Sequence, residues 1–263
     1  MVEDRIIKCE GCSNESYVTI PIARVISKLD ELFATNDLAS VGRLLEYWER
    51  EARCLGDERG LLEILNEEIG YYRRTAEKDK ALLAVNEAFA LIDKLDCAQI
   101  ESSGTIYLNG ATTMKSFGLA DEAMEYYAKA KAIYEKHISP NDYRMAAFYN
   151  NISSAYVDLG DVLSAEQCCH RAIEILECVG GCDGEIAVTL VNLAHMYHNV
   201  DPCDERIYEN VEKAYELLKN ERNVHDGNFA FLCSKCYPSF GYFGYFEYEK
   251  EIKALTEKIY AGN

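Results

Sequence analysis

A fixed interval of 42 residues runs through this 263-residue sequence and constrains its fold more than any other feature. Small residues recur at this interval at Ala88, Ala130, Ala172 and Ala214. A second series keeps the interval with larger apolar residues at Leu91, Ile133, Ile175, Leu217 and Ile259. Such a period is typical of repeat proteins, in which each unit packs only on its neighbours. The sequence therefore predicts an elongated solenoid.

Each unit is predicted to contain two helices. Only four prolines occur in the chain, and apolar residues recur three and four positions apart, which is the spacing of an amphipathic helix. Gly118 and Gly160 each stand five residues before an alanine, Ala123 or Ala165, and glycine commonly ends a helix. The pattern predicts a helix, a glycine turn and a second helix, with alanines where the two helices approach closely.

Three stretches share one pattern of bulky, apolar and small residues. The first stretch carries Tyr107, Ala111, Met114, Ala123, Tyr127 and Ala130. The second carries Tyr149, Ile152, Ser153, Tyr156, Ala165, Cys169 and Ala172. The third carries Leu190, Leu193, Ala194, Tyr197 and Ala214. This pattern resembles the tetratricopeptide repeat, in which such residues alternate along two antiparallel helices.

The resemblance implies that helix A of each unit lines a concave groove and that helix B forms the convex back. It is looser towards the N-terminus, where 61–91 puts Glu68 at a usually apolar position and 25–48 keeps only the helix–turn–helix outline. The 42-residue unit is longer than the usual repeat of about 34 residues. It is similar to the longer bacterial-type units and to those of kinesin light chains.

The predicted fold is therefore all-α, a tetratricopeptide-like right-handed superhelical solenoid of about five antiparallel helix pairs. Residues 1–21 are expected to form an N-terminal tail, and residues 22–261 a single solenoid domain. The unit boundaries are expected near 22–57, 61–96, 104–138, 146–180, 187–220 and 228–261.

Charge and composition limit the classes of partner. The 45 acidic and 27 basic residues give a formal net charge of −18, which repels nucleic acid. No apolar run reaches the roughly 18 residues that a membrane span needs, and the start of the sequence lacks the apolar core of a signal peptide. Eleven cysteines, an odd and scattered set, fit a reducing compartment better than a disulfide framework. We therefore predict a cytoplasmic protein that binds neither nucleic acid nor membrane.

A ladder of asparagines is the main candidate site. Asn109, Asn151 and Asn192 occupy one helix A position, 42 and then 41 residues apart, and Asn66 lies one position out of phase. Asparagine is an indifferent helix former, so a packing or binding role is the better explanation. A carboxamide can bond both the C=O and the N–H of an extended peptide. The resemblance supports this use, because peptide-pheromone receptors and chaperone cofactors of this fold employ groove asparagines. The alternative is that these side chains bond neighbouring backbone or water.

Other polar residues are predicted to line the same groove. Ser154 belongs to this set. Arg73, Arg74 and Lys115 lie one turn further along and would favour an acidic group on the ligand; alternatively they pair with acids such as Glu67 or Glu68. His195 and His198 are spaced like two metal ligands, but no third ligand accompanies them, so groove lining is the better interpretation.

The C-terminal stretch holds a CxxC pair and many aromatics. Continuing the period places Cys233 and Cys236 at core positions of the last helix A. The alternatives are a redox dithiol, or zinc shared with Cys9 and Cys12, although the two ends of the array should lie about 40 Å apart. Pro238 is expected to end this helix early. Five aromatics beyond it are expected to cap the solenoid or to form a homodimer contact: Phe240, Tyr242, Phe243, Tyr245 and Phe246.

We predict a non-enzymatic scaffold that binds a protein or an extended peptide in its concave groove and needs no cofactor or metal. No phosphate-loop or nucleophile motif is present in the sequence. The alternatives are a peptide-responsive regulator similar to the pheromone receptors, a homo-oligomeric scaffold, or a zinc or redox protein that uses its CxxC pairs.

Overall fold

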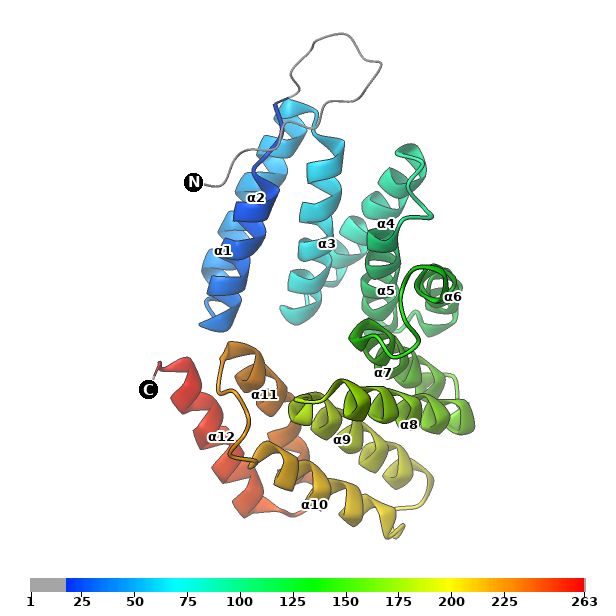
Figure 1. The fold of residues 1–263 in the computed structure, drawn as a ribbon, viewed down its shortest axis with the longest axis vertical. Helices are drawn as coiled ribbons and strands as arrows, with labels where there is room; N and C mark the ends of the chain where they lie inside the picture. The colour runs from blue at the N-terminus through cyan, green and yellow to red at the C-terminus, as the bar shows by residue number, and fades with distance from the viewer. Residues whose placement is uncertain (1–17, 263) are drawn as a thin grey trace.

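A computed structural model describes residues 18–262. Within them twelve helices follow one another and no strand occurs (Figure 1). The A helices are α1 (Ile22–Ala34), α3 (Glu58–Arg74), α5 (Glu101–Ser116), α7 (Tyr143–Asp158), α9 (Asp183–Val200) and α11 (Gly227–Tyr242). The B helices are α2 (Leu38–Leu55), α4 (Lys78–Lys94), α6 (Ala120–His137), α8 (Val162–Val179), α10 (Arg206–Leu218) and α12 (Phe246–Tyr260).

The all-α repeat solenoid is confirmed. From α3 onwards, each A helix packs mainly on the B helix of its own unit, and successive A helices lie next to one another. The described residues form six helix pairs, one in each of the six expected units and one more than the count of about five pairs. Cys9 and Cys12 lie outside the described residues.

Short-range chemistry sets many of the helix ends. Asp57 accepts a hydrogen bond from the backbone N–H of Gly60 (2.9 Å), and Asp161 does the same for Ser164 (3.1 Å), so each begins a helix. Gly118 (φ 86°) and Gly160 (φ 79°) end α5 and α7 in left-handed conformations, as the sequence predicted. These signals place turns within units, at Gly118, Gly160 and Asp161, and one turn between units, at Asp57.

The core follows the 42-residue series. Ala88, Ala130, Ala172 and Ala214 are all fully buried (0% exposed), and each lies on a B helix. Because alanine has the smallest apolar side chain, the helices approach closely at these positions. Larger apolar residues fill the space between neighbouring units.

Helix α11 does not end at Pro238, contrary to the expectation; it continues to Tyr242. An internal proline costs about 3 kcal/mol. Phe240 lies just beyond it, is fully buried (0% exposed), and meets Tyr215 and Tyr248 at ring-centroid distances of 6.1 and 6.2 Å. Burying a side chain of this size contributes about 1.5–3 kcal/mol, which largely offsets the proline.

The array curls until its two ends meet, as the arrangement of α1, α3 and α11 in Figure 1 shows. Helix α1 contacts α11, and a Cβ atom placed on Gly227 would lie 2.3 Å from the backbone oxygen of Ala34. The expected separation of about 40 Å between the ends is therefore wrong, because it assumed units stacked in a straight line. We call this contact between the end of α1, the end of α3 and the start of α11 the seam.

Candidate protein-interaction surface

The A helices share one face that is not buried by the B helices. On α3 this face carries Asn66, Gly70, Arg73 and Arg74, and the matching exposed or half-buried positions of the later A helices are also mostly polar. We call this row of side chains the inner stripe. Its later members are Thr105, Asn109, Thr112, Asn151, Ser154, Asn192, His195, Phe231 and Lys235.

The asparagines of the inner stripe form a ladder that is partly bonded to itself. Asn109 Nδ2 donates to Asn66 Oδ1 at 2.9 Å, so Asn66 is in register despite its extra residue of spacing. Asn151 Nδ2 donates to the backbone oxygen of Ala147 at 2.8 Å. The alternative that these side chains bond neighbouring protein groups therefore holds for the amide nitrogens of Asn109 and Asn151. Among the described residues, Oδ1 of Asn109, Oδ1 of Asn151 and the whole amide of Asn192 form no hydrogen bond, so they can accept a ligand's N–H groups.

Lys235 continues the ladder and was missed in the sequence. It follows Asn192 by 43 residues, the same interval that separates Asn66 from Asn109. The 42-residue interval was sufficient to place Lys235 at the position of Asn151 in the last unit. The change from asparagine to lysine hid this correspondence. The residue is exposed, and partial desolvation of its ammonium, followed by the charges of Arg73 and Arg74, lowers the pKa of that group.

The predicted cations of the inner stripe separate into two kinds. Lys115 pairs with Asp158 (Nζ–Oδ2 3.4 Å), so the alternative of pairing with an acid holds for it. Arg73 makes a long contact to the Thr113 hydroxyl (3.5 Å), and Arg74 donates to Asn36 Oδ1 (2.7 Å). Neither arginine pairs with a carboxylate in the described part of the chain.

Acidic side chains occupy the earlier half of the same face of α3. Burial raises the pKa of Glu63 and of Glu67, and for Glu67 a long hydrogen bond from Asn66 Nδ2 (3.3 Å) opposes that shift. The face thus changes from acidic near Glu63 to basic at Arg73 and Arg74. A ligand lying along α3 would meet both signs of charge.

The two histidines of α9 pack against α11. His195 Nε2 lies 2.8 Å from Ser239 Oγ, and its ring centroid lies 4.7 Å from that of Phe243. Burial lowers the pKa of His195, and the neighbouring His198 lowers it further. His198 meets Tyr242 edge-on at a centroid distance of 5.4 Å. No group of three metal-binding side chains converges in the described residues.

Cys233 and Cys236 are core residues, as the period predicted. Both are fully buried (0% exposed). Burial raises the pKa of the Cys233 thiol to about 12 and that of the Cys236 thiol further. A thiol that resists ionisation is a poor nucleophile, so the two sulfur atoms serve packing.

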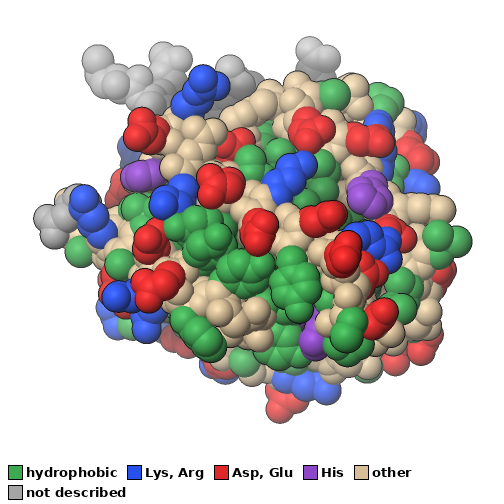
Figure 2. All heavy atoms as spheres, turned by 90° about the horizontal axis from the view of Figure 1, so that it is seen from below, with side chains coloured by type: hydrophobic (Ala, Val, Ile, Leu, Met, Phe, Trp, Pro, Cys, Tyr) green, Lys and Arg blue, Asp and Glu red, His purple; other side chains and the backbone are tan. Residues whose placement is uncertain are grey.

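The C-terminal aromatics divide between core and surface. Phe240 is buried, Phe243 lies against His195, and Tyr245 Oη donates to Glu212 (3.0 Å). Tyr242 and Phe246 stand out by their exposure, at 61% and 68%. Figure 2 shows hydrophobic side chains gathered on the lower face of the molecule. The homodimer contact stays a prediction that now rests on Tyr242 and Phe246.

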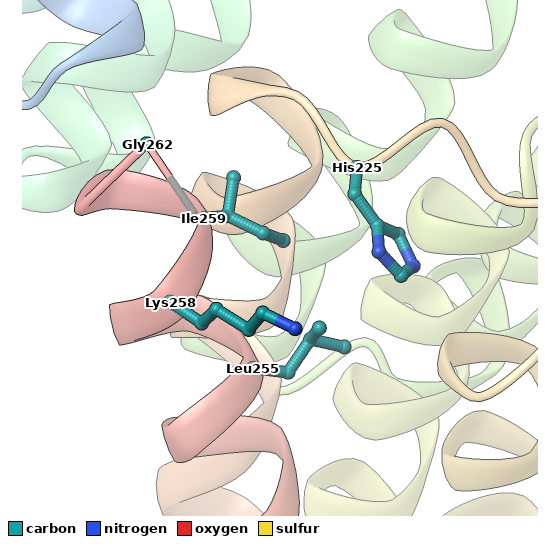
Figure 3. A pocket seen from close by; sticks show the side chains of 5 residues that line it. All are labelled: His225, Leu255, Lys258, Ile259 and Gly262. Carbon is teal, nitrogen blue, oxygen red and sulfur yellow. The ribbon is translucent and has the colours of Figure 1, made fainter.

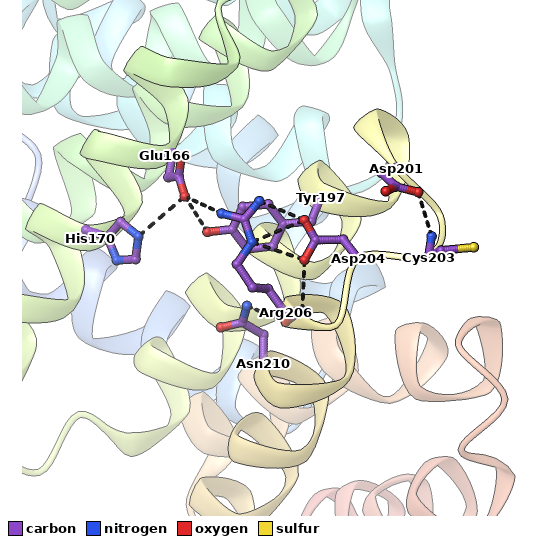
Figure 4. A network of polar contacts seen from close by, with 8 residues as sticks. All are labelled: Glu166, His170, Tyr197, Asp201, Cys203, Asp204, Arg206 and Asn210. Carbon is purple, nitrogen blue, oxygen red and sulfur yellow. Dashed lines mark hydrogen bonds and ion pairs between the residues drawn. The ribbon is translucent and has the colours of Figure 1, made fainter.

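Two further features lie apart from the inner stripe. A hollow of about 410 Å³ beside the end of α12 is lined by His225, Leu255, Lys258, Ile259 and Gly262 (Figure 3). A polar network joins α8, α9 and α10 (Figure 4): Tyr197 Oη donates to Glu166 (2.6 Å), and Arg206 pairs with Glu166 (3.1 Å) and with Asp204 (2.7 Å). The charged groups of this network have partners within it. Because α8 belongs to one unit and α9 and α10 belong to the next, the network joins neighbouring units.

Comparison with known proteins supports the repeat family. The sequence model of the tetratricopeptide repeat matches residues 145–177. None of the curated protein sequences matches the chain significantly. Within the described residues, no helix combines the length and apolarity of a membrane span.

Among the solved structures similar to this chain, one shares its fold over most of its length. BtubC (BKLC) from P. vanneervenii superimposes with a TM-score of 0.53 and 17% identity, covering 92% of each chain. A putative kinesin light chain from Podosopora anserina, with nearly identical tetratricopeptide-like repeats, gives 0.49 and 16%, covering 76% of this chain and 95% of its own. A tetratricopeptide repeat protein from Parabacteroides merdae gives 0.45 and 15%, covering 91% and 79%. The 42-residue period, the twelve helices of the described residues and the matched unit together show a tetratricopeptide-like repeat fold, in which one unit matches the sequence model of the tetratricopeptide repeat.

Proposed function

We propose that this protein is a non-enzymatic scaffold that binds an extended segment of a protein partner along the inner stripe. Tetratricopeptide repeats in general support protein–protein interaction. The observation that carries the proposal is the set of three amides on consecutive A helices, Asn109, Asn151 and Asn192, whose acceptor oxygens take part in no hydrogen bond among the described residues.

The chemistry of the stripe suits a peptide backbone. An extended segment offers N–H and C=O groups in regular succession, and a carboxamide can bond either kind. The bond between Asn109 and Asn66, and that from Asn151 to its own helix, fix the orientation of these amides before a ligand arrives. Fixed side chains lose less conformational entropy on binding.

A substitution at Gly70 can test whether the partner binds on the inner stripe. It lies on the inner stripe within α3, and a Cβ atom placed there would meet no other atom within 4 Å. A side chain at this position therefore starts from open space on the inner stripe. Gly70→Trp is expected to block the stripe, whereas Gly70→Ala is expected to leave it open.

The experiment is capture of a partner from an extract of the source organism, followed by measurement of its affinity for variants. Replacing Asn109, Asn151 and Asn192 by alanine is expected to weaken binding at least about tenfold, since each lost hydrogen bond contributes about 0.5–1.5 kcal/mol. The control replaces two exposed amides of the B helices, Asn86→Ala and Gln167→Ala, and is expected to bind normally. Unchanged affinity in the triple variant and in Gly70→Trp would remove the proposal.

A further inference from the structure

The seam is built from side chains that belong to the inner stripe. The Arg74 guanidinium carbon of α3 lies 4.5 Å from the centroid of the Phe231 ring of α11, and both residues are members of the stripe. Lys235 Nζ lies over the same ring, also 4.5 Å from its centroid. Cations over an aromatic ring are stabilised by its electron-rich face. In the closed array the two ends of the stripe therefore bind each other.

The first unit also holds Arg74 in this position. Arg74 Nη2 donates to Asn36 Oδ1 at 2.7 Å, and the guanidinium carbon lies 5.7 Å from the centroid of the Phe33 ring. Arg74 and Phe231 are both half-buried. Their contact therefore withdraws part of each side chain from a ligand that lies along the inner stripe.

Closure of the seam brings like charges together. Burial lowers the pKa of the Lys235 ammonium, and the charges of Arg73 and Arg74 lower it further. The ion pairs among the described residues include none of these three cations. Because their repulsion opposes the contacts with the Phe231 ring, the seam is held more weakly than the interfaces between neighbouring units.

We propose that the seam is an autoinhibitory contact, which covers one end of the inner stripe until a protein segment displaces it, so that the partner binds the open array. This inference rests on the proposed function, because the displacing segment is the one bound along the stripe. Binding and opening are then coupled in both directions. The apparent dissociation constant of the partner equals its value for the open array divided by the open fraction.

The test uses a variant that opens the seam without changing the inner stripe. Gly227 is not a member of the stripe, and a Cβ atom placed there would lie 2.3 Å from the backbone oxygen of Ala34, so Gly227→Val is expected to open the contact. The matched control is Asn228→Val, which places the same side chain at the neighbouring, exposed position of α11. Circular dichroism checks that both variants keep their helicity.

Phenylglyoxal, which modifies guanidinium groups, measures opening in the absence of a partner. In the wild type and in Asn228→Val, Arg74 should react more slowly than Arg222, an exposed residue between α10 and α11. In Gly227→Val the rate at Arg74 should rise at least about tenfold, because a minor open form is populated at about 10% or less. The rate at Arg222 should not change. An unchanged rate at Arg74 in Gly227→Val would overturn the inference.

The affinity of each variant is measured for the purified protein that the wild type captures. Gly227→Val should bind it at least about tenfold more tightly, and Asn228→Val should match the wild type. In the wild type, binding should raise amide hydrogen exchange at the end of α1, which belongs to the seam but not to the stripe. Equal or weaker binding by Gly227→Val, or exchange that does not rise in the complex, would overturn the inference.

The two proposals fail in different ways. If affinity depends on Asn109, Asn151 and Asn192 but not on opening by Gly227→Val, the proposed function stands and the autoinhibition is wrong. If Gly227→Val binds more tightly but the asparagine variant binds normally, the seam controls access and the role of the ladder is wrong. If no protein is captured, both proposals fall.

Discussion

The Arg74 guanidinium of α3 lies over the ring of Phe231 of α11, 4.5 Å from its centroid, and joins parts of the chain that are 157 positions apart. The same side chain donates to Asn36 Oδ1 at 2.7 Å in the turn between α1 and α2. One residue thus connects the first unit, the second unit and the last unit. The seam is small compared with the interfaces between neighbouring units, so it is the contact that should open first.

We predict that Gly227→Val opens the seam. A Cβ atom at this position would lie 2.3 Å from the backbone oxygen of Ala34, and backbone cannot move aside as a flexible side chain can. The radius of gyration from small-angle X-ray scattering should increase, and amide hydrogen exchange should rise at the end of α1 and the start of α11. Gly70→Ala, a matched change in open space, should leave both measurements unchanged. Identical scattering for Gly227→Val and wild type would contradict the closed array.

The helices and their stacking could be predicted from the sequence because both depend on neighbours in the chain. The 42-residue series located the buried alanines, and Gly118 and Gly160 located turns. Closure of the array could not be predicted, because it accumulates from small rotations between units that no single residue specifies. For the same reason the meeting of Arg74 with Phe231 was beyond sequence analysis.

The second prediction concerns Glu68, which stands at a usually apolar position of the repeat. Its side chain is only 3% exposed, and Oε1 has no hydrogen-bond partner in the described structure. Burial, followed by the nearby charge of Glu49, raises the pKa of Glu68 from 4.5 to about 8. The folded protein therefore keeps a proton that the unfolded chain loses, so the free energy of unfolding should fall as pH rises from about 4.5 to about 8.

Glu68→Gln should remove this pH dependence. At pH 8 the variant should be more stable than the wild type by an amount on the order of a few kcal/mol, and near pH 4.5 the two should be similar. Urea denaturation at a series of pH values measures the difference. Glu216→Gln, at an exposed position of α10, should follow the wild type. A pH profile unchanged by Glu68→Gln would show that this carboxyl is solvated in the folded protein.

The third prediction separates packing thiols from reactive ones. In the native protein, Cys233 and Cys236 should resist alkylation by iodoacetamide, because both are buried and burial raises the pKa of each thiol. Cys54, Cys178 and Cys203 are exposed and should react first. Mass spectrometry after a short exposure distinguishes the two groups, and unfolding in urea should remove the difference. Early labelling of Cys233 and Cys236 would revive the redox dithiol.

Site-specific photo-cross-linking tests the central claim most directly. A photoreactive phenylalanine analogue replaces Asn192, an exposed rung of the ladder, or Asn86, an exposed residue of the B helix α4. After irradiation with the captured partner, we expect a covalent adduct from position 192 and none from position 86, with the attached peptide identified by mass spectrometry. An adduct from position 86 and none from position 192 would place the partner on the B helices and contradict binding along the inner stripe.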